Sequence, residues 1–556
     1  MYDSFSVLIG GRAGDGVNEA GNLLGRLISR LGYRIYAEVD YPSLIRGGHN
    51  FCVVRASAQA IGARTDALDV VLALTAETVD RHRARLRSGG TLVVDAANVK
   101  DVPRGADVVA VDVVTLLKEE GAPQVMRNTC LLGAFARVAG IPWETVEDTV
   151  RKHTPREQEL NLRVARRGYQ AAEQRRVLPS LGRAPQAVIN GNEAIGLGLA
   201  RGGLEAFIAY PMTPVTGLLH FMAHYAEDFG FTVVQPESEL AVMLMSLGMA
   251  YAGRRAAVCT SGGGFCLMTE GFSLSGAAEL PVTVVLGQRP GPSTGLPTYT
   301  SQSELHFALH AGQGEFPRVI VAPATPLEAY EWSPAVLGLS WKYQVPGVIL
   351  VDKTLCEGSF STDAGEAMSL PVYEVAAWDG ASPYKRYART DTGVSPLAFP
   401  PLPGEAVKVD SYEHDEAGLT TEDAAETVAM QEKRLGKLVQ LEHEIELLPA
   451  VKVTGPAEAT TALLCWGSNG PVCEEVAAGL GLKVIRPRVL WPFPAVQMER
   501  ALRGVQRTVC VEGNATGQLL SLLRLQGLDA DDALRKYDGR PFSVEDLEAG
   551  LAEVLS

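Results

Sequence analysis

The stretch "IAYPMTPVTG", residues 208–217, determines how the middle of this 556-residue chain folds. An apolar strand runs into Tyr210 and Pro211. A helix is expected directly after Thr213, because Pro214 suits the first helical position and threonine suits the N-cap. Thr213 would then lie beside backbone N–H groups that have no partner inside the helix, and such a place attracts anions. The stretch therefore predicts a strand–helix unit with an anion site at the end of the strand.

Strand and helix patterns alternate along most of the chain, which predicts an α/β fold with several mostly parallel sheets. Residues 1–180 and 186–360 form two such α/β regions, separated by the linker "RVLPSLGRAP". Residues 361–455 are irregular and rich in proline, with one long helix expected from Thr421 to Leu447. The pattern returns to α/β over 456–556, so we expect three α/β domains and one irregular linker region.

The composition excludes several classes of protein. Hydrophobic residues make up 46% of the chain and charged residues 21%, which are values of a globular protein, and the net charge of −15 argues against a nucleic-acid binder. No apolar run is long enough to span a bilayer, and the N-terminal stretch lacks a basic segment or cleavage site, so we expect a cytoplasmic protein without a membrane partner. The eight cysteines form no CxxC pair, so buried free thiols are expected and no metal on this chain.

Two motifs in the first domain have more than one interpretation. "GGRAGDGVNEAG", residues 10–21, has GxxGxG spacing rather than GxGxxG and lacks a clear ribose-binding acid. A tight strand-to-helix turn is therefore favoured over nucleotide binding, and the GDG at 14–16 does not have the frame of a magnesium–diphosphate motif. In "YPSLIRGGHNFCVVR", residues 41–55, Arg46 and His49 flank a Gly-Gly turn. These two cations either belong to a polar turn or face a ligand or partner, and the sequence does not separate the alternatives.

The second domain has polar residues after several predicted strands. Glu237 and Glu239 begin an almost entirely apolar helix, where an acidic residue favours the helix dipole, and where poor solvation of Glu239 would raise its pKa. The triple glycine of "TSGGGFCLMTEG" (260–271) leads another helix, and "GQRPGPSTGLPT" (287–298) places Arg289 in a rigid loop. Ligands of open α/β sheets bind at the carboxyl ends of strands, and an arginine fixed there suits a carboxylate.

Taken together and in order, these motifs resemble the α subunits of 2-oxoacid:ferredoxin oxidoreductases in which a γ-type domain precedes the pyrimidine-binding domain. The resemblance covers nearly the whole chain: "GGRAGDGV", "YPSLIRGGHN", "YPMTP", "ESELA", "TSGGGF", "RPGPSTGLPT", "YKRY", "EHDEAG" and "EGNATGQL". It implies a γ-type domain over 1–180, a thiamine-diphosphate pyrimidine-binding domain over 186–360 and a transketolase C-terminal-like domain over 456–556. One departure is Val215-Thr216, where many relatives have two serines, which puts only secondary hydroxyl contacts in doubt.

The resemblance also implies roles for individual residues. Glu239 would hydrogen-bond N1′ of the thiamine-diphosphate pyrimidine and so assist ylide formation, and its spacing to Gly248 favours it over Glu237. The carboxylate of the 2-oxoacid substrate would be bound by Thr213, Arg289 and Thr298. The residues that would contact the cofactor, besides Glu239, are Tyr210, Pro211, Gly262 and Gly263.

The implied activity is oxidative decarboxylation of a 2-oxoacid to an acyl-CoA with reduction of ferredoxin, and 2-oxoglutarate is the favoured substrate. A broad-specificity, pyruvate or branched-chain enzyme, a nicotinamide-dependent dehydrogenase and a non-catalytic scaffold or regulatory paralogue are the alternatives. The chain lacks a recognisable diphosphate half and cluster ligands, so the resemblance implies a β subunit that brings Mg²⁺ and a [4Fe-4S] cluster and shares the thiamine diphosphate. The expected partners are this β subunit, ferredoxin and coenzyme A, in a dimer of αβ units.

Overall fold

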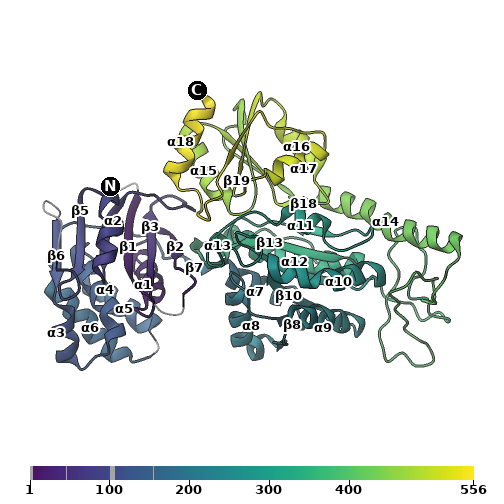
Figure 1. Ribbon diagram of the computed structural model, residues 1–556, viewed down its shortest axis with the longest axis horizontal. Helices are drawn as coiled ribbons and strands as arrows, with labels where there is room; N and C mark the ends of the chain where they lie inside the picture. The colour runs from purple at the N-terminus through teal and green to yellow at the C-terminus, as the bar shows by residue number, and fades with distance from the viewer. Residues whose placement is uncertain (1–3, 45–46, 101–106, 155) are drawn as a thin grey trace. The chain divides into compact units, whose positions relative to one another are not determined.

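The computed structural model describes residues 4–44, 47–100, 107–154 and 156–556, and the chain divides into two compact units (Figure 1). Unit 1 comprises Met1–Asn190, Glu357–Asp363 and Phe542–Ala552, and unit 2 comprises Gly191–Cys356, Ala364–Pro541 and Glu553–Ser556. Each unit combines sheets with covering helices, which confirms the predicted α/β class. Within the described ranges no helix has the length and apolarity that a membrane crossing requires.

Unit 1 is built on one eight-stranded mixed sheet. In spatial order its strands are β6 (Asp107–Val111), β5 (Leu86–Asp95), β4 (Leu68–Ala73), β1 (Ser4–Arg12), β3 (His49–Ser57), β2 (Arg34–Asp40), β14 (Ser359–Thr362) and β7 (Ala187–Asn190). The strands from β6 to β1 run parallel, whereas β3, β2, β14 and β7 pair antiparallel. β2 and β3 pair antiparallel because the connection between them is too short to hold the crossover that a parallel pair needs.

Helices pack on this sheet and bury a continuous apolar core. The helices of this core are α1 (Val17–Ser29), α3 (Val113–Glu120), α4 (Arg127–Val138), α5 (Trp143–His153) and α6 (Gln158–Ala171). α2 (Ala76–His82) contributes Val79 to a second apolar cluster, and α18 (Val544–Leu555) belongs to unit 1 as far as Ala552. Short 3-10 turns lie at Arg83–Arg85 and Gln124–Met126. α4 and α6 approach so closely that a Cβ on Gly133 would lie 2.0 Å from the Ala165 carbonyl oxygen. Glycine at this position therefore lets the two backbones pack directly together.

The glycine-rich stretch of unit 1 forms a tight turn between β1 and α1. The Asp15 amide donates to the Arg12 carbonyl at 3.0 Å, and the Asp15 carboxylate accepts from the Arg12 amide at 2.8 Å. Arg127 of α4 pairs with the same carboxylate at 2.6 Å. The Asp15 carboxylate thus binds residues of unit 1 itself, which agrees with the tight strand-to-helix turn that the sequence favours for this motif.

Unit 2 contains a seven-stranded sheet that is parallel except at one edge. Its strands in spatial order are β18 (Val489–Trp491), β12 (Val319–Val321), β13 (Pro346–Asp352), β11 (Val282–Gln288), β10 (Ala256–Ser261), β8 (Ala206–Ala209) and β9 (Thr232–Val234), with β18 antiparallel to β12. The helices of this layer are α7 (Gly191–Arg201), α8 (Thr216–Phe229), α9 (Glu239–Tyr251), α10 (Gly262–Ala278), α11 (Leu305–His310), α12 (Pro326–Tyr343) and α13 (Lys353–Glu357). The strands from β8 to β13 are almost completely buried, which explains their near-continuous apolar sequences.

A five-stranded sheet completes unit 2, and we call it with its helices the C-terminal layer. Its strands are β15 (Val451–Thr454), β17 (Lys483–Pro487), β16 (Thr461–Cys465), β19 (Arg507–Glu512) and β20 (Asp532–Arg535), and its helices are α15 (Asn469–Leu480), α16 (Ala495–Leu502) and α17 (Gln518–Leu525). Only β15 runs antiparallel to its neighbour. The eight cysteines are free thiols, and all but Cys266 are buried.

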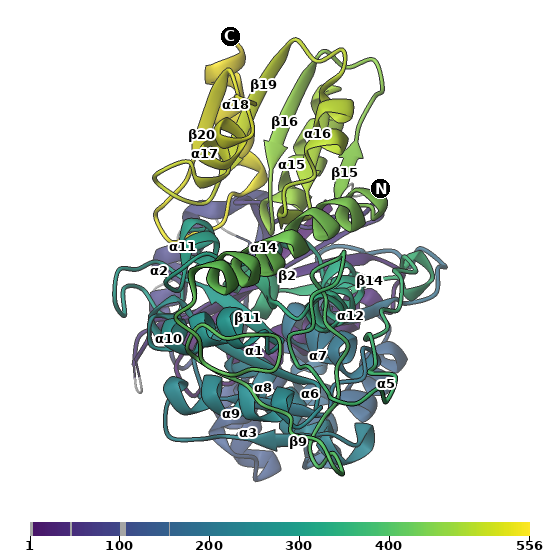
Figure 2. The same cartoon turned by 90° about the vertical axis from the view of Figure 1, so that its right-hand side faces the viewer.

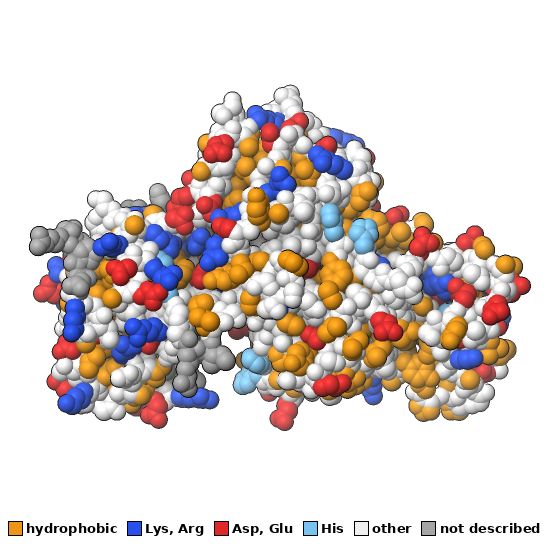
Figure 3. All heavy atoms as spheres, viewed as in Figure 1, with side chains coloured by type: hydrophobic (Ala, Val, Ile, Leu, Met, Phe, Trp, Pro, Cys, Tyr) orange, Lys and Arg blue, Asp and Glu red, His pale blue; other side chains and the backbone are white. Residues whose placement is uncertain are grey.

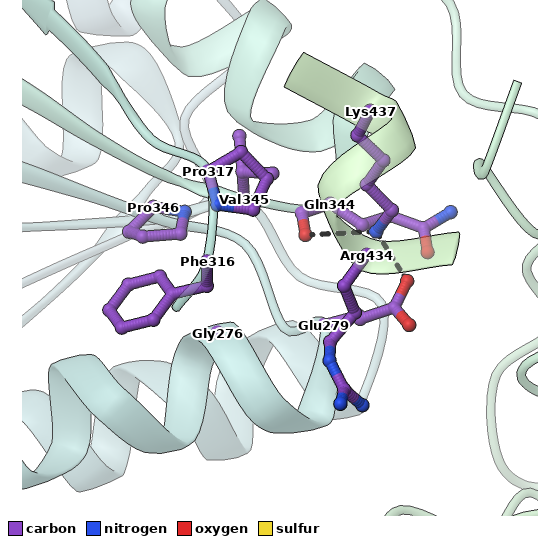
Figure 4. Close-up of a pocket in the computed structure, with 9 residues that line it drawn as sticks. All are labelled: Gly276, Glu279, Phe316, Pro317, Gln344, Val345, Pro346, Arg434 and Lys437. Atoms are coloured by element: carbon purple, nitrogen blue, oxygen red, sulfur yellow. Dashed lines mark hydrogen bonds and ion pairs between the residues drawn. The ribbon is translucent and has the colours of Figure 1, made fainter. Parts of the chain in front are cut away.

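The long helix α14 (Ala424–Leu447) leads from an irregular segment to the C-terminal layer (Figure 2). It begins where Asp423 caps it, since the Asp423 carboxylate accepts from the Ala425 and Glu426 amides at 2.9 and 3.0 Å. Its middle is fixed to the end of α10 by buried ion pairs between Glu279 and the lysines Lys433 and Lys437. Figure 4 shows Lys437 and Glu279 pointing toward each other. The helix expected over 421–447 is therefore present, starting three residues later.

Candidate active site

The turn after β8 differs from the sequence expectation. The helix α8 begins at Thr216 with Val215 as its N-cap, so Thr213 is not the N-cap and Pro214 is not the first helical residue. The Val215 amide donates to the Met212 carbonyl at 3.0 Å, and the Thr213–Pro214 peptide is cis. The expectation was wrong because residues 212–215 close a hydrogen-bonded turn of their own before the helix starts.

The predicted site residues share one position in unit 2: each follows the carboxyl end of a parallel strand. They are Tyr210, Pro211 and Thr213 after β8, Glu239 after β9, Gly262 and Gly263 after β10, and Arg289 and Thr298 after β11. Since β9, β8, β10 and β11 are neighbours in this sheet, their carboxyl ends lie along one edge. Ligands of open α/β sheets bind at such an edge.

Arg289 and Thr213 are in direct contact. Arg289 Nη1 donates to the Thr213 carbonyl oxygen at 3.1 Å, and the arginine side chain is buried, with 8% exposed. Burial lowers the pKa of Arg289, and the charge of Glu304 opposes that shift. Among the described residues, Arg289 Nε and the hydroxyl of the buried Thr298 have no hydrogen-bond partner. A buried guanidinium and hydroxyl with unused donors are suited to an anionic ligand.

Glu239 and Glu237 occupy different surroundings. Glu237 is exposed, whereas Glu239 is buried as the first residue of α9, behind the N-cap Ser238. A Cβ on Gly264 would lie 2.5 Å from Glu239 Oε1, so the carboxylate packs against the glycine turn that begins α10. The structure thus places a buried carboxylate beside the triple glycine, at the edge of the sheet.

Glycines and an aromatic residue form the open part of the site. Gly263 and Tyr210 are exposed, while Pro211 is half-buried. A Cβ on Gly263 would have only the Ser293 carbonyl oxygen near it, at 3.9 Å, so space remains above this glycine. The structure therefore brings the β8, β10 and β11 turns together at the sheet edge with an accessible face.

Sequence reasoning missed Glu304, a buried glutamate between the predicted residues. Its Oε1 would lie 2.7 Å from a Cβ on Gly262, and its Oε2 has no hydrogen-bond partner in the described part of the chain. Burial raises the pKa of Glu304 to about 8, although the nearby Arg289 charge lowers it. The available signal was an acidic residue immediately before the short apolar helix α11, at the end of the loop that carries Arg289.

Of the two residues that flank the Gly-Gly turn, Arg46 lies outside the described residues, and His49 belongs to unit 1. His49 is buried at the start of β3, and its Nε2 lies 2.9 Å from Nε2 of His82. Arg85 Nη1 lies 3.2 Å from Nδ1 of His82, and burial lowers the pKa of both histidines. His49 is therefore part of a buried side-chain network, and whether the turn faces a ligand or partner stays a prediction.

Two family models and several known proteins match this chain. Residues 198–434 match the family model "Pyruvate flavodoxin/ferredoxin oxidoreductase, thiamine diP-bdg", and residues 6–171 match "Pyruvate ferredoxin/flavodoxin oxidoreductase". The 2-oxoacid:ferredoxin oxidoreductase subunit alpha of a Sulfolobus species is 30% identical, with 99% of this chain and 97% of the relative covered. The 2-oxoglutarate oxidoreductase subunit KorA of Mycobacterium tuberculosis is 26% identical, with 97% and 89% covered.

A solved structure is similar over the full length. It is a 2-oxoglutarate:ferredoxin oxidoreductase from Magnetococcus marinus with 2-oxoglutarate, coenzyme A and succinyl-CoA bound. It is 27% identical, covers 100% of both chains and gives a TM-score of 0.89. The fold and these matches define a thiamine-diphosphate-dependent oxidoreductase subunit. More particularly, the chain belongs to the family of 2-oxoacid:ferredoxin oxidoreductase α subunits.

The residues present fit thiamine diphosphate. Ser261 Oγ, Arg289 Nε and Thr298 Oγ1 are buried polar atoms without a partner in the described ranges, and the buried Glu239 carboxylate can pair with a ring nitrogen. No group of three or more His, Cys, Asp or Glu in the described ranges is arranged to hold a metal ion. Where Mg²⁺ and the iron–sulfur cluster bind therefore stays a prediction.

Proposed function

We propose that the chain is the α subunit of a 2-oxoglutarate:ferredoxin oxidoreductase that works only with a β subunit. In the proposed reaction, a 2-oxoacid, coenzyme A and two oxidised ferredoxins give an acyl-CoA, carbon dioxide, a proton and two reduced ferredoxins. The observation that carries this proposal is the buried Arg289–Thr213 contact, with unused donors, at the carboxyl edge of the sheet. The preference for 2-oxoglutarate is supported by the substrate bound in the Magnetococcus relative.

Thiamine diphosphate, when bound, supplies a nucleophilic carbon and an electron sink for the decarboxylation. Glu239 would share a proton with N1′ of its pyrimidine ring. This carboxylate is buried, and no other residue of α9 is acidic. Arg289 and Thr298 would bind the substrate carboxylate through the guanidinium Nε and the hydroxyl, until that group leaves as carbon dioxide. Tyr210, Pro211, Gly262 and Gly263 would line the cofactor.

The dependence on a β subunit is supported by an exposed apolar surface beside the site. The α9–α10 face consists of Leu240, Leu244, Met245 and Leu267, whose exposed fractions are 44%, 51%, 39% and 48%. Figure 3 shows exposed apolar side chains in the region where Figure 1 labels α8, α9 and α10. Contiguous exposed apolar surface typically marks a protein interface. The β subunit would cover this face, complete the cofactor site with Mg²⁺ and the [4Fe-4S] cluster, and pass electrons to ferredoxin, in a dimer of αβ units.

A substrate panel tests this proposal. The complex co-purified with its β subunit is assayed for viologen reduction with 2-oxoglutarate, pyruvate and branched-chain 2-oxoacids, each with coenzyme A. We expect the highest kcat/KM for 2-oxoglutarate. Similar values for all substrates would favour a broad-specificity enzyme, for which the Sulfolobus relative's printed name, 2-oxoacid:ferredoxin oxidoreductase, provides support. Absence of activity with every 2-oxoacid would overturn the proposal.

A further inference from the structure

The loop that carries Arg289 and Thr298 is held at its far end by the C-terminal layer of unit 2. We call residues 289–304 the substrate loop. Its middle, residues 291–296, is exposed, and it is closed by hydrogen bonds from the Leu296 amide to Pro290 and from the Tyr299 amide to Leu296. These local bonds do not fix where the loop ends. That position depends on what contacts residues 299–304.

Every polar group of Gln302, in the main chain and the side chain, forms a hydrogen bond with the C-terminal layer. Its amide donates to the Gly513 carbonyl at 2.8 Å, and its carbonyl accepts from Asn514 Nδ2 at 3.1 Å. Its side-chain Nε2 donates to the Trp466 carbonyl at 2.8 Å, and its Oε1 accepts from Asn469 Nδ2 at 2.7 Å and from the Gly513 amide at 2.8 Å. Gln302 is 2% exposed, so water cannot replace these bonds at low cost.

Residues on both sides of Gln302 also form hydrogen bonds with the C-terminal layer. The Thr300 amide donates to the Gly539 carbonyl at 3.0 Å. Gln518 Nε2 donates to the Ser303 carbonyl at 2.8 Å, and Gln518 Oε1 accepts from the His306 amide at 3.0 Å. The end of the substrate loop is therefore bonded to the C-terminal layer through main chain and side chains together.

The partner side is itself a rigid structure, built from the "EGNATGQL" stretch at 512–519. The buried Glu512 carboxylate accepts from Trp466 Nε1 at 3.2 Å, from Asn514 Nδ2 at 2.8 Å and from the Leu519 amide at 2.7 Å. Asn514 Oδ1 accepts from the Gly517 amide at 2.8 Å. Glu512 thus fixes both Trp466 and Asn514, two of the residues that Gln302 contacts.

We propose that Gln302 is a positioning residue, through which the C-terminal layer sets the geometry of the carboxylate-binding loop. Gln302 lies between Thr298 and Glu304, which both have a buried side-chain oxygen without a hydrogen-bond partner in the described ranges, as does Ser303. A displaced loop would move the Thr298 hydroxyl away from Arg289 and hence from the proposed substrate carboxylate. This inference rests on the proposed function for its substrate, but its structural part concerns the free chain alone.

The test compares Gln302→Met with the matched control Gln344→Met. Gln344 is also buried, at 1% exposed, but its Nε2 donates to Ser395 and its Oε1 accepts from Arg386, away from the loop. In hydrogen exchange of the full chain, peptides covering 296–304 should exchange faster in Gln302→Met and at the wild-type rate in Gln344→Met. If Gln302→Met does not fold, Gln518→Met, which loses the bonds to Ser303 and His306, should show the same localised change.

Kinetics of the complex with its β subunit supply the second measurement. Gln302→Met should raise the KM for the 2-oxoacid by about tenfold or more and leave kcat nearly unchanged, because a displaced binding loop weakens substrate and transition state alike. Gln344→Met should keep the wild-type KM. Gln302→Glu should approach the wild-type KM as the pH falls, since a protonated carboxyl can still donate to the Trp466 carbonyl.

The outcomes separate this inference from the proposed function. If the wild-type complex oxidises no 2-oxoacid, the proposed function fails, while hydrogen exchange still decides whether Gln302 orders the loop. Unchanged exchange over 296–304 in a folded Gln302→Met chain would overturn the inference. Equal rises of KM in Gln302→Met and Gln344→Met would also overturn it, because the effect would then be general destabilisation.

Discussion

At the scale of single residues, Glu239 is the group whose role can be tested without turnover. It is buried beside Gly264, where the proposed cofactor would lie. Glu239→Gln keeps the size of the side chain but cannot share a proton, so kcat should fall by about 10²- to 10⁴-fold. Hydrogen exchange at C2 of thiamine diphosphate bound to the complex checks this directly. A wild-type exchange rate in the variant would remove Glu239 from the proposed mechanism.

Arg289→Lys tests the carboxylate site. A lysine ammonium cannot reproduce two-pronged binding by a guanidinium. Each lost charge-assisted hydrogen bond is worth about 1.5–3 kcal/mol, so kcat/KM should fall roughly tenfold or more. Steady-state assays with several 2-oxoacids should show the same loss, because all of them carry the carboxylate. Unchanged kinetics would show that Arg289 does not bind substrate.

Glu304 predicts a pH dependence. Because burial raises the pKa of Glu304 to about 8 from an ordinary 4.5, the group is neutral at pH 7 and becomes an anion above pH 8. The anion would compete with the substrate carboxylate for Arg289, so KM should rise above about pH 8, by roughly tenfold. In Glu304→Gln the KM should stay flat over this range. A rise of equal size in the variant would assign the titration to another group.

The same pKa shift has a consequence for stability. A carboxyl whose pKa is raised on folding stabilises the fold fully below the unfolded value of 4.5, and this contribution is lost as the pH rises through about 8. Glu304→Gln should therefore have its largest stability advantage over the wild type in alkaline solution. Thermal unfolding of the two chains on both sides of this window measures the difference.

At the scale of elements, helix α14 depends on one buried carboxylate. Burial alone would raise the pKa of Glu279, but Lys433, Lys437 and Arg386 hold it well below its usual value. The stabilisation is therefore present above pH 4.5 and is lost as the pH falls into the acid range. Glu279→Gln would leave two buried ammonium groups unpaired and should cost about 3–5 kcal/mol of unfolding free energy.

Denaturant unfolding measures this loss, and hydrogen exchange should show it first in α14. Glu426→Gln is the matched control, since Glu426 lies on the same helix and pairs only with Arg389 at the surface. That substitution should cost about 1 kcal/mol or less. Equal losses in the two variants would contradict the role given to Glu279.

The elements also show what the sequence could predict. Strands of unit 2 were recognisable because they are buried on both faces and hence continuously apolar, and α14 was recognisable by its length and by the polar residues before it. The start of α8 could not be recognised. The preference of proline for the first helical position does not reveal that residues 212–215 form a separate turn.

Contacts between residues far apart in the sequence could not be predicted either. The antiparallel pairing of β3 and β1 joins residues as far apart as Ser4 and Ser57, and the alternation of strands and helices carries no direct signal for it. Glu304 and Gln302 acquire their surroundings only when the β11 loop meets the rest of unit 2. By contrast, the residues after β8, β9, β10 and β11 could be predicted to meet, because parallel strands place their carboxyl ends at one edge.

At the scale of the whole molecule, the central claim is that this chain is the α subunit of a 2-oxoacid:ferredoxin oxidoreductase that a β subunit completes. The α9–α10 face is exposed in the chain by itself and lies beside Glu239, the first residue of α9. An active site shared across this face would give an interface that buries the apolar side chains and the cofactor together.

The most direct measurement is viologen reduction by one preparation of this chain before and after the β subunit is added, with 2-oxoglutarate, thiamine diphosphate, Mg²⁺ and coenzyme A present throughout. We predict that the chain alone is colourless, binds the cofactor weakly and reduces no dye, and that the reconstituted complex is brown and reduces viologen only when the 2-oxoacid is supplied. A brown preparation of the chain alone that reduces the dye, or a complex that ignores every 2-oxoacid, would contradict the account.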